Sequence, residues 1–496
     1  MKNKYIKGGI EFYIYSEFTN MCAMNYSKIS AFKFWGLCVL LMFTMSAQAQ
    51  FDPEPLLHIH SDFEDTTFNN RRVRHVDLEA KIIQLKTIPG FEVKLLGKSF
   101  LGRNIHLVKV GQGDTKVLLW SQMHGDESTA TMAILDLFNF FTTTGRWSGL
   151  KENILDECTL YFIPMLNPDG AELFVRRNAQ QIDINRDAIY LQSPEARILK
   201  SVRDSLQPDF GFNLHDQHKY HAAGDQKTPA SISLLAPAYN QEKEVNAVRE
   251  HAMQVAGVIH NTLKKIIPMH IGRYDDEHEP RAFGDNIQKW GTSTILIETG
   301  AFENDPEKQF LRKVNFIALL SALESISNKA YYSVDLQDYW SIPENKNRLN
   351  DFIIKNITME DHGVQYLTDI SYNRSEFSGL ASIQDMGDLT VYKGYAEWDG
   401  TGKRLVSGKL YPALIKNLKK LDKLDLDNLL HQGYTEVRLK KVPTTKSKDT
   451  SLISILKINE TKNNTFMPGS NPNALIYQGE KLIFLLKNGN LISIAN

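Results

Sequence analysis

The sequence contains little that would cross-link the chain, hold it in a membrane or attract a polyanion. Only three cysteines occur in 496 residues, so the chain cannot depend on a network of disulfides. Lys plus Arg total 57 and Asp plus Glu total 58, which leaves a formal net charge of −1 and no basic footprint for nucleic acid or an anionic membrane. No apolar run reaches the roughly 20 residues that a membrane-spanning helix needs. With 42% hydrophobic and 23% charged residues, the composition is that of an ordinary globular protein.

The longest apolar run lies near the N-terminus and predicts a signal peptide. Residues 34–45 are almost entirely apolar, follow Lys28 and Lys33, and precede the small-residue sequence AQA at 47–49. This order is typical of a secretory signal cleaved before Gln50. We therefore expect a secreted or periplasmic protein, in which Cys158 is the single remaining cysteine.

The central part of the chain has the pattern of an α/β layered domain. Short runs rich in Val, Ile and Leu alternate with longer segments of helical period. The runs predict buried strands at 117–121, 159–165, 210–214, 231–235 and 294–297. The longer segments predict helices at 76–85, 128–141, 194–205, 241–265 and 306–327. We assign residues 50–332 to this domain.

The composition changes after Tyr332, where Asp, Asn, Lys and Ser become frequent, and residues 333–496 are expected to form a smaller, β-rich accessory domain. Strands are predicted within 388–398 and 474–494, with Asn488-Gly489 as a type I′ hairpin turn. Leucines spaced along 412–430 predict an amphipathic helix. This region has no catalytic constellation; packing or docking is its expected role, with substrate or glycan binding as the alternative.

Several polar fragments follow predicted strands. They occupy residues 123–127 (MHGDE), 167–170 (NPDG), 183–186 (DINR), 213–216 (NLHD) and 297–299 (IET). In open α/β sheets, ligands bind in the crevice outside the carboxyl ends of the strands. The five fragments are therefore expected to converge on one pocket.

Two of these fragments contain candidate metal ligands. His124 and Glu127 are three residues apart at a strand-to-helix turn, which directs both side chains toward one point. A catalytic zinc takes three protein ligands and keeps an open position for water. His215, at the end of another strand, is the best third ligand, and His218 and His221 are nearby competitors.

Together the fragments resemble the M14 family of zinc carboxypeptidases. The matching pieces are the His-x-x-Glu pair, the Asn-Pro-Asp-Gly loop, Arg-Arg-Asn at 176–178 followed by Asp-x-Asn-Arg at 183–186, a third His and a later Glu. They occur in the family's order. The resemblance implies an α/β fold with a mixed, mostly parallel central sheet and helices on both faces, and one zinc ion per chain.

The resemblance also implies a role for each matching residue. Glu298 corresponds to the family's general base, and Arg176 to the arginine that stabilises the oxyanion, with Arg177 as its uncertain neighbour. Asn185 and Arg186 match the pair that binds a terminal carboxylate, for which a planar guanidinium gives bidentate recognition. Asp183 would hold the imidazole of a ligand in its metal-binding tautomer.

Some positions depart from the family or leave alternatives open. Asp216 follows the third ligand where the family has a small polar residue, which changes the charge beside the metal. The residue that closes over the substrate is either Tyr274 or Arg281. If Phe283 lines the pocket for the substrate side chain, the pocket would be apolar. If Asp285 lines it, the pocket would prefer basic side chains.

The sequence thus predicts an exported zinc carboxypeptidase that hydrolyses the C-terminal peptide bond of substrates with a free carboxylate. The alternative within the same fold is a zinc amidase acting on cell-wall peptides or N-acyl amino acids. A third hypothesis, from a different class, is an inactive protein that uses the cleft or the accessory domain for binding. No nucleic acid partner and no integral membrane segment are expected.

Overall fold

The structure is a computed structural model that describes residues 51–361, 363–375, 378–441, 452–460 and 464–494. The predicted signal peptide lies outside the described residues. All of the features below belong to the compact unit Phe51–Asn496. Within the described ranges, no helix is long and apolar enough to cross a membrane.

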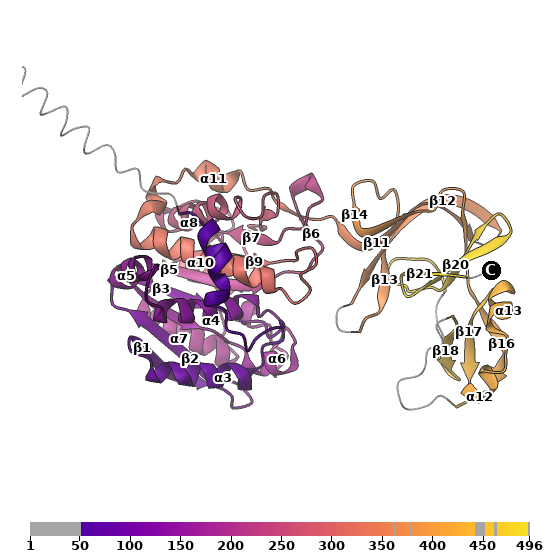
Figure 1. The fold of residues 1–496 in the computed structure, drawn as a ribbon, viewed down its shortest axis with the longest axis horizontal. Coiled ribbons are helices and arrows are strands. Elements are labelled where there is room, and N and C mark those ends of the chain that lie inside the picture. The colour runs from indigo at the N-terminus through magenta and orange to yellow at the C-terminus, as the bar shows by residue number, and fades with distance from the viewer. Residues whose placement is uncertain (1–50, 362, 376–377, 442–451, 461–463, 495–496) are drawn as a thin grey trace, which may run out of the picture. The chain divides into compact units, whose positions relative to one another are not determined.

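An eight-stranded sheet forms the centre of the first part of this unit (Figure 1), in the order β1-β2-β4-β3-β5-β9-β7-β8. The strands are β1 (Phe91–Lys98), β2 (Asn104–Gly111), β3 (Thr115–Trp120), β4 (Cys158–Ile163), β5 (Phe210–Asp216), β7 (Ile232–Leu235), β8 (Ile271–Arg273) and β9 (Ser293–Thr299). The pairs β3–β4, β3–β5, β5–β9 and β7–β8 are parallel, whereas β1–β2, β2–β4 and β7–β9 are antiparallel. The expected mixed, mostly parallel sheet is confirmed.

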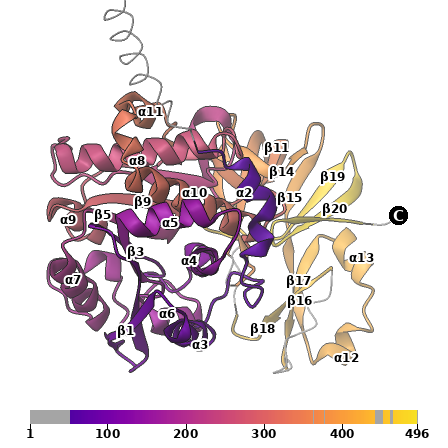
Figure 2. The same cartoon turned by 60° about the vertical axis from the view of Figure 1, so that its left-hand side comes forward.

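Helices cover both faces of the sheet, as can be followed in Figures 1 and 2. The longer ones are α3 (His75–Gln84), α4 (Thr129–Thr142), α5 (Ser148–Glu157), α7 (Pro194–Leu206), α8 (Ala247–Leu263), α9 (Phe283–Lys289) and α10 (Gln309–Ser327). The shorter ones are α2 (Glu54–Ile59), α6 (Pro168–Leu173) and α11 (Leu336–Trp340).

Alternation along the central strand β3 explains why two layers of helices are needed. Val117 and Leu119 pack in one buried core with α4, α8 and α10, while Leu118 and Trp120 pack in a second core with α7 and α9. Successive side chains of a strand point to opposite faces, so a strand that is apolar at every position has to be covered on both sides. These two cores fix the sheet, and with it the ends of the strands.

All five predicted strands and all five predicted helices of this part are present, with shifted ends. The largest shift is at α8, which begins at Ala247 rather than near residue 241, because the side chain of Asn246 accepts a hydrogen bond from the backbone N–H of Arg249 and so caps the helix there. Strands β1 and β2 and helix α9, which the sequence analysis did not predict, are also present.

The C-terminal part is β-rich, as expected. One sheet contains β11 (Leu349–Asp361), β12 (Val364–Arg374), β13 (Ala381–Gly387), β14 (Lys393–Asp399), β15 (Arg404–Ser407), β19 (Ala474–Gln478), β20 (Lys481–Lys487) and β21 (Asn490–Ser493). The predicted turn at Asn488-Gly489 joins β20 to β21 with φ of 50° and 67°, as a type I′ turn requires. The domain boundary at residue 332 stays a prediction.

The predicted amphipathic helix over 412–430 is wrong. Residues 409–415 form the strand β16 (Lys409–Ile415), which pairs with β17 (Tyr434–Leu439) beside β18 (Ser454–Lys457). Two short helices follow, α12 (Leu418–Leu421) and α13 (Leu426–His431), and each starts where an Asn417 or Asp425 side chain accepts a backbone hydrogen bond. These caps divide the leucine pattern into separate elements.

A small two-stranded sheet joins segments that are distant in the sequence. β6 (His221–Ala223) pairs antiparallel with β10 (Asn345–Asn347), so the segment that follows β5 is held by residues that precede β11. The Tyr220 hydroxyl donates to Asp351 over 2.8 Å, and the Tyr395 hydroxyl donates to the backbone carbonyl of Lys219 over 2.6 Å.

Candidate metal centre and active site

The predicted site residues lie at the carboxyl edge of the central sheet. His124 follows the end of β3, His215 is the second-last residue of β5, and Glu298 lies near the end of β9. Because β5 and β9 are parallel neighbours, His215 is directly opposite Glu298. A cavity of about 1530 Å³ opens at this edge, lined by all of these residues except His215.

The turn that carries His124 and Glu127 has a tightly packed backbone. Gln122 has a left-handed backbone (φ 47°), and its side-chain amide donates to the carbonyl of Gly125 over 3.0 Å. A Cβ atom on Gly125 would lie 2.0 Å from the carbonyl carbon of Gly170, in the Asn-Pro-Asp-Gly loop. Only a glycine at 125 lets these two loops come this close.

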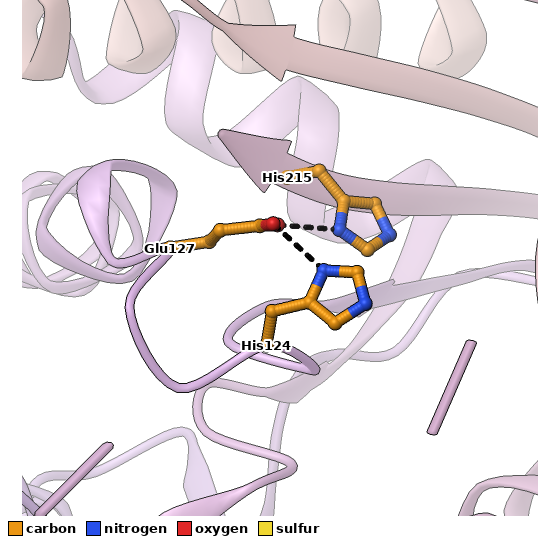
Figure 3. A group of neighbouring side chains, drawn as sticks. All are labelled: His124, Glu127 and His215. Carbon is orange, nitrogen blue, oxygen red and sulfur yellow. Dashed lines mark hydrogen bonds and ion pairs between the residues drawn. The ribbon is translucent and has the colours of Figure 1, made fainter. Parts of the chain in front are cut away.

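His124, Glu127 and His215 converge as the sequence predicted (Figure 3). One oxygen of Glu127 lies 2.7 Å from Nδ1 of His124 and the other lies 2.6 Å from Nδ1 of His215. The potential ligand atoms all lie within 4.8 Å of one another, and all three side chains are buried. In the described part of the chain no other group of three such side chains meets this condition, and His218 and His221 lie outside it.

Neighbouring side chains orient the two imidazoles. Asp183 Oδ1 lies 3.0 Å from Nε2 of His124, so an Nε2–H that donates to this carboxylate leaves Nδ1 with a lone pair toward Glu127. Asn185 Nδ2 lies 3.5 Å from Nε2 of His215. The predicted position of Asp183 behind the first ligand is therefore the one it occupies.

The electrostatics of this cluster favour a cation at its centre. Burial opposes a charge on His124, but the carboxylates of Glu127 and Asp183 raise its pKa to about 9. Burial also opposes a charge on Glu127, yet the two histidines hold its pKa well below the usual value. Two imidazole nitrogens and a carboxylate are ligands of catalytic zinc, so the donor set fits this ion.

Glu298 lies on the cavity wall, and its carboxyl group holds a proton more strongly than an exposed glutamate does. Its pKa is raised well above the usual range, first by removal of water and then by the negative charge of Glu127. A carboxylate that holds a proton more strongly is a better general base near neutral pH.

Arg176 connects the ligands to Asp183. Its guanidinium donates to Oδ2 of Asp183 over 3.0 and 3.1 Å and to Oε1 of Glu127 over 3.1 Å, and it lines the cavity. Arg177 instead donates to the backbone carbonyl of Gln181 and does not line the cavity. The structure thus distinguishes between the two neighbouring arginines.

Asn185 and Arg186 both line the cavity, and Arg186 has a partner that the sequence analysis did not find. The Nε of Arg186 lies 3.2 Å from a carboxylate oxygen of Glu279, which also binds Arg281 through two hydrogen bonds of 2.9 and 3.0 Å. Asn185 is fixed because its side-chain oxygen accepts a hydrogen bond of 2.9 Å from the backbone N–H of Phe283.

The structure separates the alternatives that the sequence left open. Tyr274 lines the cavity, and the charge of Glu298 followed by burial raises its pKa, whereas Arg281 is turned to Glu279 and is 58% exposed. Phe283 is fully buried in the core with Trp120, whereas Asp285 lines the cavity. Burial raises the pKa of Asp285 to about 6, above its usual value.

The side chains at this edge define a class of enzyme. Two histidines and one glutamate, with a second glutamate across from them at the edge of an α/β sheet, are the side chains of a mononuclear metallohydrolase. The sequence profile of the family "Zinc carboxypeptidase" (Peptidase M14) matches residues 80–366, more than half of the chain. The chain belongs to this family.

Individual relatives match over shorter segments. Carboxypeptidase 2 of Trichophyton tonsurans is 27% identical over 129 residues, which cover 25% of this chain and 23% of that protein. Carboxypeptidase M of Mus musculus is 28% identical over 108 residues, which cover 18% of this chain and 24% of that protein. The chain thus matches about a quarter of the length of these curated relatives. A metallo-carboxypeptidase structure from Burkholderia cenocepacia shares 18% identity over 52% of this chain and 69% of that one, with a TM-score of 0.42.

Proposed function

We propose that the protein is an exported zinc carboxypeptidase that removes residues from the free C-terminus of peptides. The observation that carries the proposal is that Asn185 and Arg186 line the same cavity as Glu127 and Glu298. A guanidinium beside a hydrolytic centre gives directional recognition of a carboxylate, which is the group that distinguishes a chain end from an internal bond.

His124, Glu127 and His215 would hold the zinc ion. When bound there, zinc polarises the scissile carbonyl and lowers the pKa of water toward about 7. Glu298 takes a proton from the attacking water and delivers it to the nitrogen that leaves. Its raised pKa suits it to this second step, because a carboxylate that is too weak a base would not retain the proton.

Arg176 and Tyr274, which both line the cavity, would both contact the substrate. The Arg176 guanidinium, already fixed by Asp183, places a cation where negative charge develops on the carbonyl oxygen. Tyr274 lies on the cavity wall under the influence of Glu298, and we assign to it the role of closing over the substrate.

The clamp for the terminal carboxylate already contains one carboxylate. Glu279 contacts Nε of Arg186, so a substrate carboxylate would bind the remaining N–H groups of this guanidinium or compete with Glu279 for it. Asp285 lines the same cavity, which favours substrates that end in Lys or Arg over those with an apolar last residue.

The assay compares peptides that end in Lys or Phe, each with a free or an amidated C-terminus, with and without a chelator. We expect cleavage of the free forms, faster release of Lys than of Phe, and loss of both with the chelator. Replacing Arg186 with Met should raise KM at least tenfold, while Arg177→Met, the matched control outside the cavity, should not. Equal cleavage of free and amidated peptides would refute the carboxypeptidase.

The alternative, a zinc amidase, would use the same residues, Asn185 and Arg186, to bind the substrate carboxylate. Its substrates would differ from peptides in the acyl group that is cleaved off. A cavity of about 1530 Å³ leaves room for an acyl portion other than a linear peptide. Purified muropeptides and N-acyl amino acids in the same assay distinguish the two, because the amidase would turn these over faster than peptides.

A further inference from the structure

Asp216, the residue after the third potential ligand, has a carboxylate that is bound by side chains outside the ligand cluster. Asp216 Oδ2 accepts hydrogen bonds from the Thr129 hydroxyl over 2.7 Å and from the Lys308 ammonium over 3.1 Å. Its other oxygen is buried and has no hydrogen-bond partner in the described structure. The backbone N–H of the same residue donates to Glu127 over 3.2 Å, which places Asp216 immediately beside the ligands.

Lys308 is held for this contact by its own surroundings. Its side chain is 8% exposed, and its ammonium also donates to the backbone carbonyl of Thr299, at the end of β9, over 3.0 Å. The backbone of Lys308 is left-handed, with φ of 55°, and it precedes α10. A buried ammonium needs partners that replace its lost hydration, and here the Asp216 carboxylate and the Thr299 carbonyl supply them and hold Lys308 in place.

The chemistry of the neighbouring carboxylate suggests that role. Zinc binds aspartate readily, and a catalytic zinc needs one coordination position free of protein ligands. Asp216 and Lys308 both line the cavity, yet Asp216 is outside the group of three side chains whose ligand atoms converge. The tie to Thr129 and Lys308 holds Oδ2 and so fixes the orientation of the whole carboxylate, including the oxygen Oδ1 that has no partner.

We propose that Lys308 and Thr129 restrain Asp216 so that it does not become a fourth protein ligand, and that they thereby keep the coordination position for water open. Lys308 is in this sense a positioning residue, acting through Asp216. The inference rests on the proposed metal site, and it accounts for the departure from the family at position 216, because the additional carboxylate is accompanied by its own buried cation.

The test compares Lys308→Met, Asp216→Asn and the double variant, each loaded with zinc or with cobalt(II). In Lys308→Met the released carboxylate should bind the metal, so the dissociation constant for zinc falls about tenfold while kcat falls at least tenfold. The visible absorption of the cobalt protein should weaken, because cobalt with an added ligand absorbs less than four-coordinate cobalt. In the double variant the carboxylate is absent, and the spectrum, zinc affinity and kcat should return toward the wild type.

The matched control is Lys81→Met, which removes the cation paired with the buried Asp65 over 2.9 Å, outside the cavity. It should lower the melting temperature and leave the cobalt spectrum unchanged. Should Lys308→Met fail to fold, Thr129→Val removes the second tie without touching the ion pair and should shift the spectrum in the same direction.

A cobalt spectrum and zinc affinity equal to the wild type in Lys308→Met, with only the stability loss of the control, would overturn the proposal. So would a double variant with the same altered spectrum as Lys308→Met, since Asp216 would then not be the added ligand. The metal measurements need no peptide, so a wild type that cleaves nothing would refute the proposed function and leave this test intact.

Discussion

At the scale of single residues, one carboxylate behind the potential ligands orients His124. Asp183 binds both Nε2 of His124 and the guanidinium of Arg176, and with these partners its pKa is lowered despite burial. One carboxylate thus connects a ligand to the cation on the cavity wall. A residue that fixes a ligand tautomer contributes to metal affinity without touching the metal.

Replacement of Asp183 by Asn should weaken zinc binding by about tenfold to a hundredfold, because an amide accepts a weaker hydrogen bond from Nε2–H and no longer holds Arg176 by charge. Chelator competition at fixed pH measures the dissociation constant. Asp187→Asn is a control in the same loop, since Asp187 contacts Gln192 and Ser193 instead. Unchanged zinc affinity in the Asp183 variant would show that it does not support His124.

The site residues differ in how far the sequence alone could identify them. His124, Glu127, His215 and Glu298 were predictable because each follows an apolar run, and parallel strands bring such positions to one edge. Lys308 and Glu279 were not, because the site residue that each contacts, Asp216 or Arg186, lies about 90 positions away in the sequence. No local pattern records such a pair.

At the scale of elements, the close approach of two loops sets the geometry of the ligand turn. Gly125→Ala would place a Cβ against the backbone of Gly170, where neither side can move independently. We expect a loss of about 2 kcal/mol or more of unfolding free energy together with weaker zinc binding. Denaturant unfolding and chelator competition measure both.

Gly149→Ala provides the matched control for that substitution. Gly149 lies in α5, and a Cβ atom added there would have no neighbour within 4 Å, so alanine should be neutral or slightly stabilising. Equal effects of the two substitutions would contradict a specific role for the contact between the loops.

Strand β6 begins with a histidine whose charge the fold disfavours. Burial, and then the neighbouring charge of His218, lower the pKa of His221 from 6.5 to about 4, and the two rings stack with centroids 4.2 Å apart. Between pH 6.5 and 4 the unfolded chain therefore binds more protons at this position than the folded chain, so stability decreases as pH falls through this window.

His221→Gln should reduce that decrease in stability between pH 6.5 and 4, as measured by denaturant unfolding at several pH values. The exposed His58, which is paired with Glu54 on α2, is the control position. An unchanged pH dependence in the His221 variant would indicate that other groups produce it.

The prediction of helices and strands succeeded where the spacing of apolar residues is uniform along the whole element. It failed where helix caps interrupt that spacing. α10 and β9 were predicted to within three residues at each end, because the apolar side chains of both belong to the core around the central sheet. The leucines of 412–430 have helical spacing, but the caps at Asn417 and Asp425 and the pairing of β16 with β17 override it. The spacing of residues within one segment cannot predict that the segment pairs with a strand elsewhere in the sequence.

At the scale of the whole molecule, metal binding and stability should be linked. The three potential ligands come from the turn after β3 and from β5, which are separate in sequence and meet only in the folded chain. A ligand that binds only the native state adds about 4 kcal/mol at a thousandfold excess over its dissociation constant. Removing zinc with a chelator should therefore lower the melting temperature, and adding zinc back should restore it.

Magnesium at the same concentration is the control for this prediction, because it prefers oxygen ligands and should not restore the melting temperature. A melting temperature that does not respond to the chelator would mean that the cluster does not hold a metal in the native protein.

The pairing of β6 with β10 also has a consequence for the order of events during synthesis. The segment just after His215 obtains its partner strand from residues 345–347, and Tyr220 obtains its partner from Asp351. A nascent chain that ends before these residues contains all three potential ligands and the proposed general base, yet lacks the strand that fixes the loop beside them. The loop beside the proposed active site thus obtains its partner strand only after the start of the C-terminal part has left the ribosome.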